Sequence, residues 1–344
     1  MSDASVLKVM DLPSPYLLFL GDTTERGYAK TAFGLRDWAP DRCVGEWSCP
    51  GATVTTDLAR LTPREAFDRG AKALVIGVAN AGGIISESWI PALTEALEAG
   101  LDLISGMHAR LADIPRLKST ADRCGRRLID VRTPPLNISI ASGRKRSGKR
   151  LLTVGTDCAI GKKYTALALA RAFNERAVPV HFRATGQTGI LIAGGGLPMD
   201  SVVVDFEAGA AELLSPDAPA RHWDVIEGQG SLFHPAYAAV SLGLLHGSQP
   251  DLIVVCHDPG RAHVLGFPEY PIPDIAETME LNLMLGRRTN PAIRCAGVSL
   301  NTSRLMPDDA AELLDRESER LGCPVMDPMR AGARFERLVD ACLC

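Results

Sequence analysis

The stretch LLTVGTDCAIGKKYTALA, residues 151–168, places a glycine-bracketed loop between two apolar segments. Residues 151–154 predict a buried strand, 155–161 a loop, and 162–175 a helix, because apolar residues recur there at helical spacing. Free backbone N–H groups and the dipole at such a helix start attract an anion, and Lys162 adds a full positive charge. The stretch therefore predicts a phosphate-binding loop.

The loop departs from the common phosphate-binding pattern at two places. That pattern has four residues between its glycines, and a Ser or Thr after the lysine whose hydroxyl binds magnesium. Here five residues separate the glycines, and Lys163 follows Lys162. A second cation in the place of the hydroxyl suits a pyrophosphate that is held and never cleaved. The candidate cofactor-binding residues are Gly155, Thr156, Asp157, Cys158, Gly161, Lys162 and Lys163.

Composition limits the classes of function. A chain of 344 residues, 46% hydrophobic, can bury two cores, and its net charge of −4 gives no reason to expect nucleic acid or an anionic membrane as a partner. No apolar run reaches membrane-spanning length, and the first residues, MSDASVLKVMDLPSP, lack a basic region followed by an apolar core. The nine cysteines contain no CxxC pair, so neither a metal site nor a disulfide framework is indicated. We expect a cytoplasmic homo-oligomer acting on a small molecule.

The first part of the chain alternates predicted strands and helices. Strands are expected at 16–21, 73–78, 101–105 and 127–131, with helices at 25–38 and 87–99. Such alternation predicts a parallel sheet covered by helices, but no GxGxxG fingerprint of a dinucleotide site is present. The predicted fold class is α/β, with two doubly wound, mostly parallel-sheet domains. We expect a Rossmann-like domain at 1–140, a basic linker at 141–150 and a P-loop domain at 151–344.

The predicted linker lies in a segment with two prolines followed by Gly, Ser and five basic residues. Such a composition is typical of a solvated connector, which is the interpretation we favour. The alternative is that these charges steer an anionic cofactor toward the loop that follows.

The second part repeats the alternation around the loop. Strands are predicted at 178–184, 223–226, 252–256 and 296–300, a glycine-rich turn at 185–189 and a helix at 204–214. Ligands of parallel sheets bind beyond the carboxyl ends of the strands, so residues that follow these strands should converge beside the loop. Each also has a structural explanation, since Asp or Asn after a strand often caps a helix. These residues are Gly186, Gln187, Thr188, Glu227, Gln229, His234, His257, Asp258, Arg261, His263, Asn301 and Arg304.

Several longer motifs resemble those of a known family. They are GTDCAIGKK, ATGQTGILIAGGG, DVIEGQGSLFHPAYA and VCHDPGR, with GVANAGG and SGMHARL in the first part. The chain resembles a bacterial family, long known only as a domain of unknown function, with a Rossmann-like N-terminal domain and a P-loop C-terminal domain. The most similar members are described as D-glutamate N-acetyltransferases. The resemblance implies acetyl transfer from acetyl-CoA, whose pyrophosphate would occupy the loop, to the amino group of D-glutamate.

That reaction requires a general base, donors for the oxyanion and cations for two carboxylates. The candidate bases are Glu227 and His234, and backbone N–H groups of the turn at 186–189 are the candidate oxyanion donors. Cys158 is an alternative covalent carrier of the acetyl group. The candidate substrate-binding residues are Arg183, Gly186, Gln187, Thr188, Arg261, Asn301 and Arg304.

Two other functions stay open at this stage. The loop also resembles that of dethiobiotin synthetase-like ATPases, which carry Thr where this chain has Lys163. An ATP-dependent ligase or kinase would need Asp157, Asp224 or Glu227 to bind magnesium through water. The third possibility is a nucleotide-binding scaffold without catalysis.

Overall fold

The computed structural model describes residues 12–330 and 332–344, which form two compact units. The N-terminal unit contains residues 12–134 together with 187–198, and the P-loop unit contains 135–186 and 199–344. Residues 1–11, which carry most of the targeting argument, lie outside the described part. Within that part, no helix combines the length and apolar character needed to cross a membrane.

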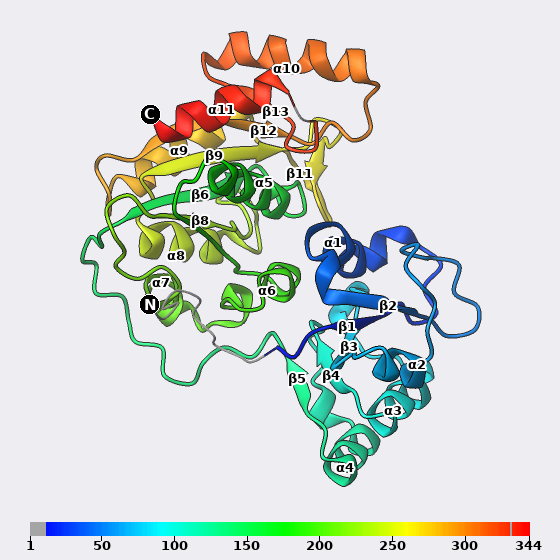
Figure 1. Cartoon of the computed structure of the whole chain (residues 1–344). Helices are drawn as coiled ribbons and strands as arrows, with labels where there is room; N and C mark the ends of the chain where they lie inside the picture. The colour runs from blue at the N-terminus through cyan, green and yellow to red at the C-terminus, as the bar shows by residue number, and fades with distance from the viewer. Residues whose placement is uncertain (1–11, 331) are drawn as a thin grey trace. The chain divides into compact units, whose positions relative to one another are not determined.

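The N-terminal unit is built on a five-stranded parallel sheet with the order β2-β1-β3-β4-β5 (Figure 1). Its strands are β1 (Tyr16–Phe19), β2 (Cys43–Trp47), β3 (Ala73–Ile76), β4 (Asp102–Ser105) and β5 (Leu128–Asp130). Its longer helices are α1 (Lys30–Trp38), α2 (Pro63–Asp68), α3 (Ile90–Glu98), α4 (Pro115–Cys124) and α6 (Gln187–Ala193). Short 3-10 turns lie at Arg26–Ala29, Pro40–Arg42, Ala81–Gly83, Glu87–Trp89 and Leu111–Asp113.

Alternate residues of the short strands build the core of this unit. Leu17 and Phe19 of β1, with Leu74 and Ile76 of β3, pack in one cluster with apolar residues of α3. The other two residues of β1, Tyr16 and Leu18, are also buried, as a parallel sheet covered on both faces requires. The predicted alternation of strands and helices in the first part is therefore confirmed.

Helix α6 corrects the predicted turn at 185–189. The chain enters a helix at Gln187, and Ile190, Leu191 and Ile192 are buried within the N-terminal unit. Thr188 Oγ1 lies 3.0 Å from Thr31 Oγ1 at the start of α1. The glycines suggested a turn. The apolar run that follows them instead forms a helix, because burying these side chains against α1 is favourable.

The P-loop unit contains a six-stranded parallel sheet with the order β13-β12-β9-β6-β8-β7. Its strands are β6 (Lys149–Gly155), β7 (Val180–Arg183), β8 (Trp223–Ile226), β9 (Leu252–His257), β12 (Arg294–Leu300) and β13 (Val325–Met326). A separate antiparallel hairpin is formed by β10 (His263–Val264) and β11 (Phe267–Pro271). Its helices are α5 (Lys162–Glu175), α7 (Val204–Leu214), α8 (Ala238–Ser248), α9 (Ile275–Gly286), α10 (Pro307–Leu321) and α11 (Ala333–Leu343), with a 3-10 turn at Met199–Ser201.

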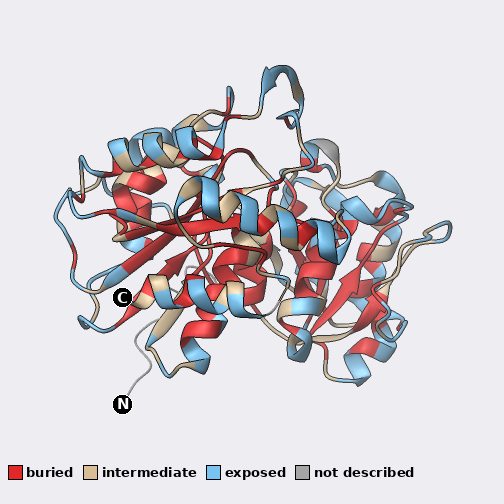
Figure 2. Cartoon of the chain, turned by 90° about the horizontal axis from the view of Figure 1, so that it is seen from above, coloured by how far each residue is buried: buried red, intermediate tan, exposed pale blue. Residues whose placement is uncertain are grey.

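Helices cover both faces of this second sheet. Helices α5 and α11 pack together on one face, whereas α8 and α9 pack on the other, with α7 against α8 (Figure 1). Strand β6 lies between β9 and β8, so the loop that follows it emerges near the middle of the carboxyl edge. The strands are buried and the helices turn an exposed face outward (Figure 2). The sheet therefore presents the loop where parallel-sheet proteins bind ligands.

The prediction that the linker is solvated is wrong for two of its arginines. Arg146 and Arg150 are 5% and 1% exposed. Arg146 Nε donates to the Ser215 carbonyl at 2.7 Å, and Arg150 Nε donates to Ser215 Oγ at 2.7 Å. Burial lowers the pKa of Arg146 to about 10. Because the forked guanidinium can satisfy several carbonyls at once, a basic stretch can be interior structure.

Glycines bring α7 and α8 close together around a buried carboxylate. A Cβ at Gly247 would collide with the Ala208 carbonyl, and one at Gly243 would lie 2.5 Å from Glu207 Oε2. Glu207 is 4% exposed, and its Oε2 has no hydrogen-bond partner among the described residues. Burial raises the pKa of Glu207 from its ordinary 4.5 to about 7.

We expect Glu207→Gln to remove a pH-dependent loss of stability. The folded protein holds the Glu207 proton more tightly than the unfolded chain, so stability present below pH 4.5 is lost as the pH rises to about 7. The neutral amide has no such titration. The difference in urea midpoint, variant minus wild type, should therefore be larger at pH 8 than at pH 5. Glu312→Gln, at an exposed position of α10, is the control. An equal wild-type-to-variant difference at both pH values would contradict the expectation.

Candidate active site

The loop after β6 closes around its own lysine. Ala159 and Gly161 adopt positive φ values of 54° and 119°, which turn the chain into α5. The side chain of Lys162, the first residue of α5, is buried, and its Nζ donates to the Asp157 carbonyl at 2.6 Å. Burial lowers the pKa of Lys162, and the nearby Cys158 and Asp157 oppose that shift. The loop thus holds the ammonium of Lys162 against its own backbone at the start of α5.

Asp157 joins the loop to the segment that follows β9. Its carboxylate is fully buried, and Oδ2 accepts from Arg261 Nη1 at 2.6 Å and from the Leu265 backbone N–H at 2.8 Å. Its Oδ1 accepts from the Cys158 backbone N–H at 2.6 Å. Arg261 Nη1 also donates to the Cys158 carbonyl at 2.7 Å. These contacts close the segment 258–265 over the loop.

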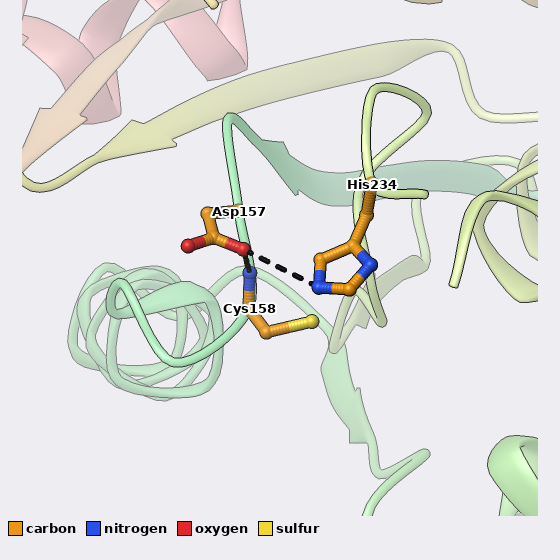
Figure 3. Close-up of side chains that lie close together, drawn as sticks. All are labelled: Asp157, Cys158 and His234. Carbon is orange, nitrogen blue, oxygen red and sulfur yellow. Dashed lines mark hydrogen bonds and ion pairs between the residues drawn. The ribbon is translucent and has the colours of Figure 1, made fainter. Parts of the chain in front are cut away.

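His234 points its Nε2 at this loop from the segment after β8 (Figure 3). Its Nδ1 accepts from the backbone N–H groups of Ala236 and Tyr237 at 3.1 and 3.2 Å, so the neutral ring carries its hydrogen on Nε2. Nε2 lies 3.8 Å from Asp157 Oδ1 and has no hydrogen-bond partner among the described residues. Burial lowers the pKa of His234, which favours this neutral form. His234 is therefore arranged as a donor.

Glu227 follows β8 and is 5% exposed. Its Oε2 accepts from the backbone N–H groups of Thr185 and Gly186 at 3.0 and 3.2 Å. Burial raises the pKa of Glu227, and the positive charge of Lys163 opposes that shift. A Cβ at Gly228, the next residue, would collide with the Thr153 carbonyl, so only glycine lets β8 end here. Glu227 thus occupies the backbone N–H of Gly186, one of the predicted oxyanion donors.

Thr165 does not restore the missing hydroxyl of the loop. Its Oγ1 donates to the Gly161 carbonyl at 3.1 Å and lies 2.8 Å from Ser299 Oγ. The side chain is fully buried beneath the loop. The Thr165 hydroxyl therefore does not take the place of the metal-binding hydroxyl of the common pattern, and Lys163 stands at that position in the sequence.

The arginines predicted to bind substrate differ in their surroundings. Arg183 makes a buried ion pair with Asp224 at 2.7 Å, and Arg261 is engaged by Asp157. The Arg304 side chain is 64% exposed and lies 3.2 Å from Asp258 Oδ2. Of the three arginines, Arg304 has the most exposed side chain.

The other predicted residues are distributed between the two units. His257 Nδ1 lies 3.0 Å from Thr156 Oγ1, and Asn301 Oδ1 accepts from the Ser303 backbone N–H at 3.2 Å. Gln187 and Thr188 belong to the N-terminal unit through α6.

Sequence reasoning missed two contributors to this site. Leu265 acts through its backbone N–H, which no sequence pattern reveals. Tyr237 packs on His234 with ring centroids 4.5 Å apart and also supplies a backbone donor. The only signal for Tyr237 was its place in the HPAY segment that begins at His234.

A small hollow beside the loop is lined by residues 152–155, 228–232, Ser241, Leu244 and Asn282.

Comparison with known proteins identifies the family. A model described as the P-loop domain of DUF1611, a domain of unknown function, matches residues 139–339, and its Rossmann-like N-terminal companion matches 42–134. The chain belongs to the DUF1611 family. A crystal structure of a DUF1611 protein from Anabaena variabilis aligns with a TM-score of 0.85 at 33% identity, covering 95% of this chain and 98% of that one. The predicted α/β fold and family resemblance are confirmed.

Two curated relatives of this family member carry the name D-glutamate N-acetyltransferase. The protein from Tritonibacter scottomollicae is 49% identical over 330 residues, covering 96% of this chain and 98% of the relative. The protein from a Pseudoalteromonas species is 48% identical over 323 residues, covering 94% and 97%. The similarity extends over both units.

We expect a double-mutant cycle to show strong coupling between Asp157 and Arg261. The pair is largely desolvated, with side chains 0% and 15% exposed, so removing one charge leaves the other buried without its partner. Asp157→Asn, Arg261→Leu and the double variant should give a coupling of about 1–3 kcal/mol in urea unfolding. The exposed pair Arg144 and Asp217 is the control and should couple far more weakly. Additive effects of the two single substitutions would contradict the closing role of this pair.

Proposed function

We propose that this chain is a D-glutamate N-acetyltransferase that uses acetyl-CoA as the acetyl donor and the loop 155–163 as part of the donor site. The carrying observation is the identity of about half of all residues, over nearly the whole of both chains, with two relatives of that name. An N-acetyltransferase requires an activated acyl donor, and the cations of the loop can stabilise negative charge that develops during the transfer.

The charges around the loop favour this function over an ATP-dependent ligase. In P-loop ATPases, magnesium is held by the hydroxyl after the lysine and by a carboxylate. Here each of the three acids considered as metal ligands meets a cation. Asp157 pairs with Arg261, Asp224 pairs with Arg183, and the charge of Lys163 acts on Glu227.

Glu227 is the better of the two base candidates. Its raised pKa moves the carboxylate toward the range in which it can take a proton from the ammonium of D-glutamate. His234 has its Nδ1 lone pair occupied by two backbone donors, and its Nε2 carries the hydrogen. We assign Glu227 the role of base and His234 that of a donor to developing negative charge.

For the acceptor, Arg304 is the strongest candidate to bind the side-chain carboxylate of D-glutamate. Its guanidinium is largely exposed and is fixed by Asp258 at one end, whereas Arg183 and Arg261 are held in less exposed ion pairs. Asn301, on the same segment after β12, is the neighbouring polar candidate.

We expect D-glutamate to exceed D-alanine in kcat/KM by about 10- to 100-fold, because a charge-assisted hydrogen bond contributes about 1.5–3 kcal/mol. Coenzyme A release is the measurement, and excess EDTA should leave the rate unchanged. Arg304→Ala should remove most of the preference, while Arg287→Ala, at an exposed position after α9, should keep it. Equal kcat/KM for the two acceptors, or phosphate release from added ATP, would reject the proposal.

We expect Glu227→Gln to lower kcat by about 10²–10⁴-fold, the usual cost of losing a positioned base. The amide keeps the size of the side chain and an oxygen for the Thr185 and Gly186 N–H groups, so KM and the fold should change little. A matched change at a solvent-exposed acid, Glu280→Gln on α9, is the control. A Glu227→Gln enzyme with near wild-type kcat from pH 6 to 9 would place the base elsewhere.

A further inference from the structure

A cysteine, a histidine and an aspartate meet inside the loop. Cys158 Sγ, His234 Nε2 and a carboxylate oxygen of Asp157 all lie within 4.8 Å of one another (Figure 3). Cys158 is partly exposed, whereas the His234 side chain is 0% exposed. A buried imidazole whose Nε2 hydrogen has no acceptor among the described residues points to a group that arrives during the reaction.

The surroundings of this cluster favour an anion over a metal ion. The carboxylate of Asp157 is already bound by Arg261 and by the Leu265 N–H. The charge of Lys162 acts on Cys158, and His234 presents a hydrogen on the nitrogen that would have to bind a metal. A cation would meet two positive charges here, whereas a thiolate or an oxyanion would be stabilised by them.

We propose that Cys158 is the nucleophile of the transferase and carries the acetyl group as a thioester between donor and acceptor. The proposal rests on the proposed function for the identity of donor and acceptor. In the first step the Cys158 thiolate bonds to the acetyl carbon, the bond from that carbon to the sulfur of coenzyme A breaks, and coenzyme A leaves as its thiolate. In the second step the amine of D-glutamate attacks, its proton passes to Glu227, and Cys158 leaves as the thiolate.

The loop geometry provides what this chemistry requires. An ammonium stabilises a neighbouring thiolate, and the charges of Lys162 and Cys158 act on each other. Asp157 Oδ1 accepts from the Cys158 backbone N–H, which fixes the residue that bears the nucleophile. His234 donates from Nε2 to the oxygen of the tetrahedral intermediate, and one such donor typically contributes about 10²–10³-fold in rate.

This assignment changes which end of acetyl-CoA meets the loop. The pantetheine arm that joins the pyrophosphate to the thioester is about as long as four extended residues, or about 14 Å. An extended acetyl-CoA therefore cannot place both groups at a loop that itself contains Cys158. Because the reactive groups converge at the loop, it receives the acetyl end, in place of the pyrophosphate that the sequence suggested.

The test uses the full-length protein and acetyl-CoA without any acceptor. An acyl-enzyme must exchange labelled coenzyme A into acetyl-CoA, and acid-quenched protein must carry one acetyl group on the peptide containing Cys158, removable by hydroxylamine. Cys158→Ala should abolish both signals and lower kcat with D-glutamate by about 10³-fold or more, as expected when a covalent nucleophile is removed. Cys124→Ala, at a partly exposed cysteine of α4, should retain both signals.

A second pair of variants tests the donor role of His234. His234→Leu should slow exchange by about 10²–10³-fold, and His234→Gln, which can place an N–H near the position of Nε2, should recover part of the rate. The exchange rate should show no alkaline limb assignable to this residue, because the neutral ring keeps its Nε2 hydrogen as the pH rises. Cys158→Ser, which is nearly isosteric, separates chemistry from folding if its thermal unfolding matches that of wild type.

The outcomes separate this inference from the proposed function. Coenzyme A release that requires D-glutamate, without exchange and with a fully active Cys158→Ala enzyme, would mean direct transfer and would overturn the inference alone. Exchange and an acetylated Cys158 without any transfer to D-glutamate would uphold the inference and overturn the proposed acceptor. Absence of exchange, acetylation and transfer would overturn both.

Discussion

The buried carboxylate of Asp157 is the contact on which the rest of the site depends. It binds Arg261 and the Leu265 N–H across the loop and the Cys158 N–H within it. A buried charge is costly unless it is paired, and the same requirement recurs around the loop. Arg183 forms an ion pair with Asp224. Glu227 accepts hydrogen bonds from two backbone N–H groups, and the positive charge of Lys163 also stabilises its carboxylate. The site is a set of compensated charges in which changing one partner disturbs its neighbours.

Under the proposed function, Lys163 directs a P-loop fold away from nucleotide hydrolysis. The fold alone does not determine the reaction, because the same strand, loop and helix can host different chemistries. A lysine at the hydroxyl position replaces a metal ligand by an ammonium, and Thr165 cannot compensate because Ser299 and Gly161 occupy its hydroxyl. The glycine loop then remains useful as a cluster of oriented donors. Acyl transfer needs such donors wherever negative charge develops on oxygen.

Much of the fold was predictable because apolar periodicity reports burial directly. The helix predicted at 162–175 agrees with α5 at both ends, and the strands around it were found. The failures have physical causes. Glycines beside Ile190 hid a helix that packs against α1, and the charges of Arg146 and Arg150 hid their burial. At the candidate site, the sequence named His234 as a candidate base, but the role that we propose for it depends on which nitrogen faces two backbone N–H groups. Such contacts arise from the path of the backbone, which composition and spacing do not encode.

The placement of α6 has a consequence for how the chain is made. Residues 187–198 complete the N-terminal unit, yet they are synthesised after β6, α5 and β7 of the P-loop unit. During translation, the first unit therefore lacks the apolar side chains of Ile190 and Leu191 until more than half of the protein has left the ribosome. The two units cannot mature one after the other, as independent domains do on a growing chain. Their folding schedules are interleaved, and a chaperone that shields the first unit would have to release it late.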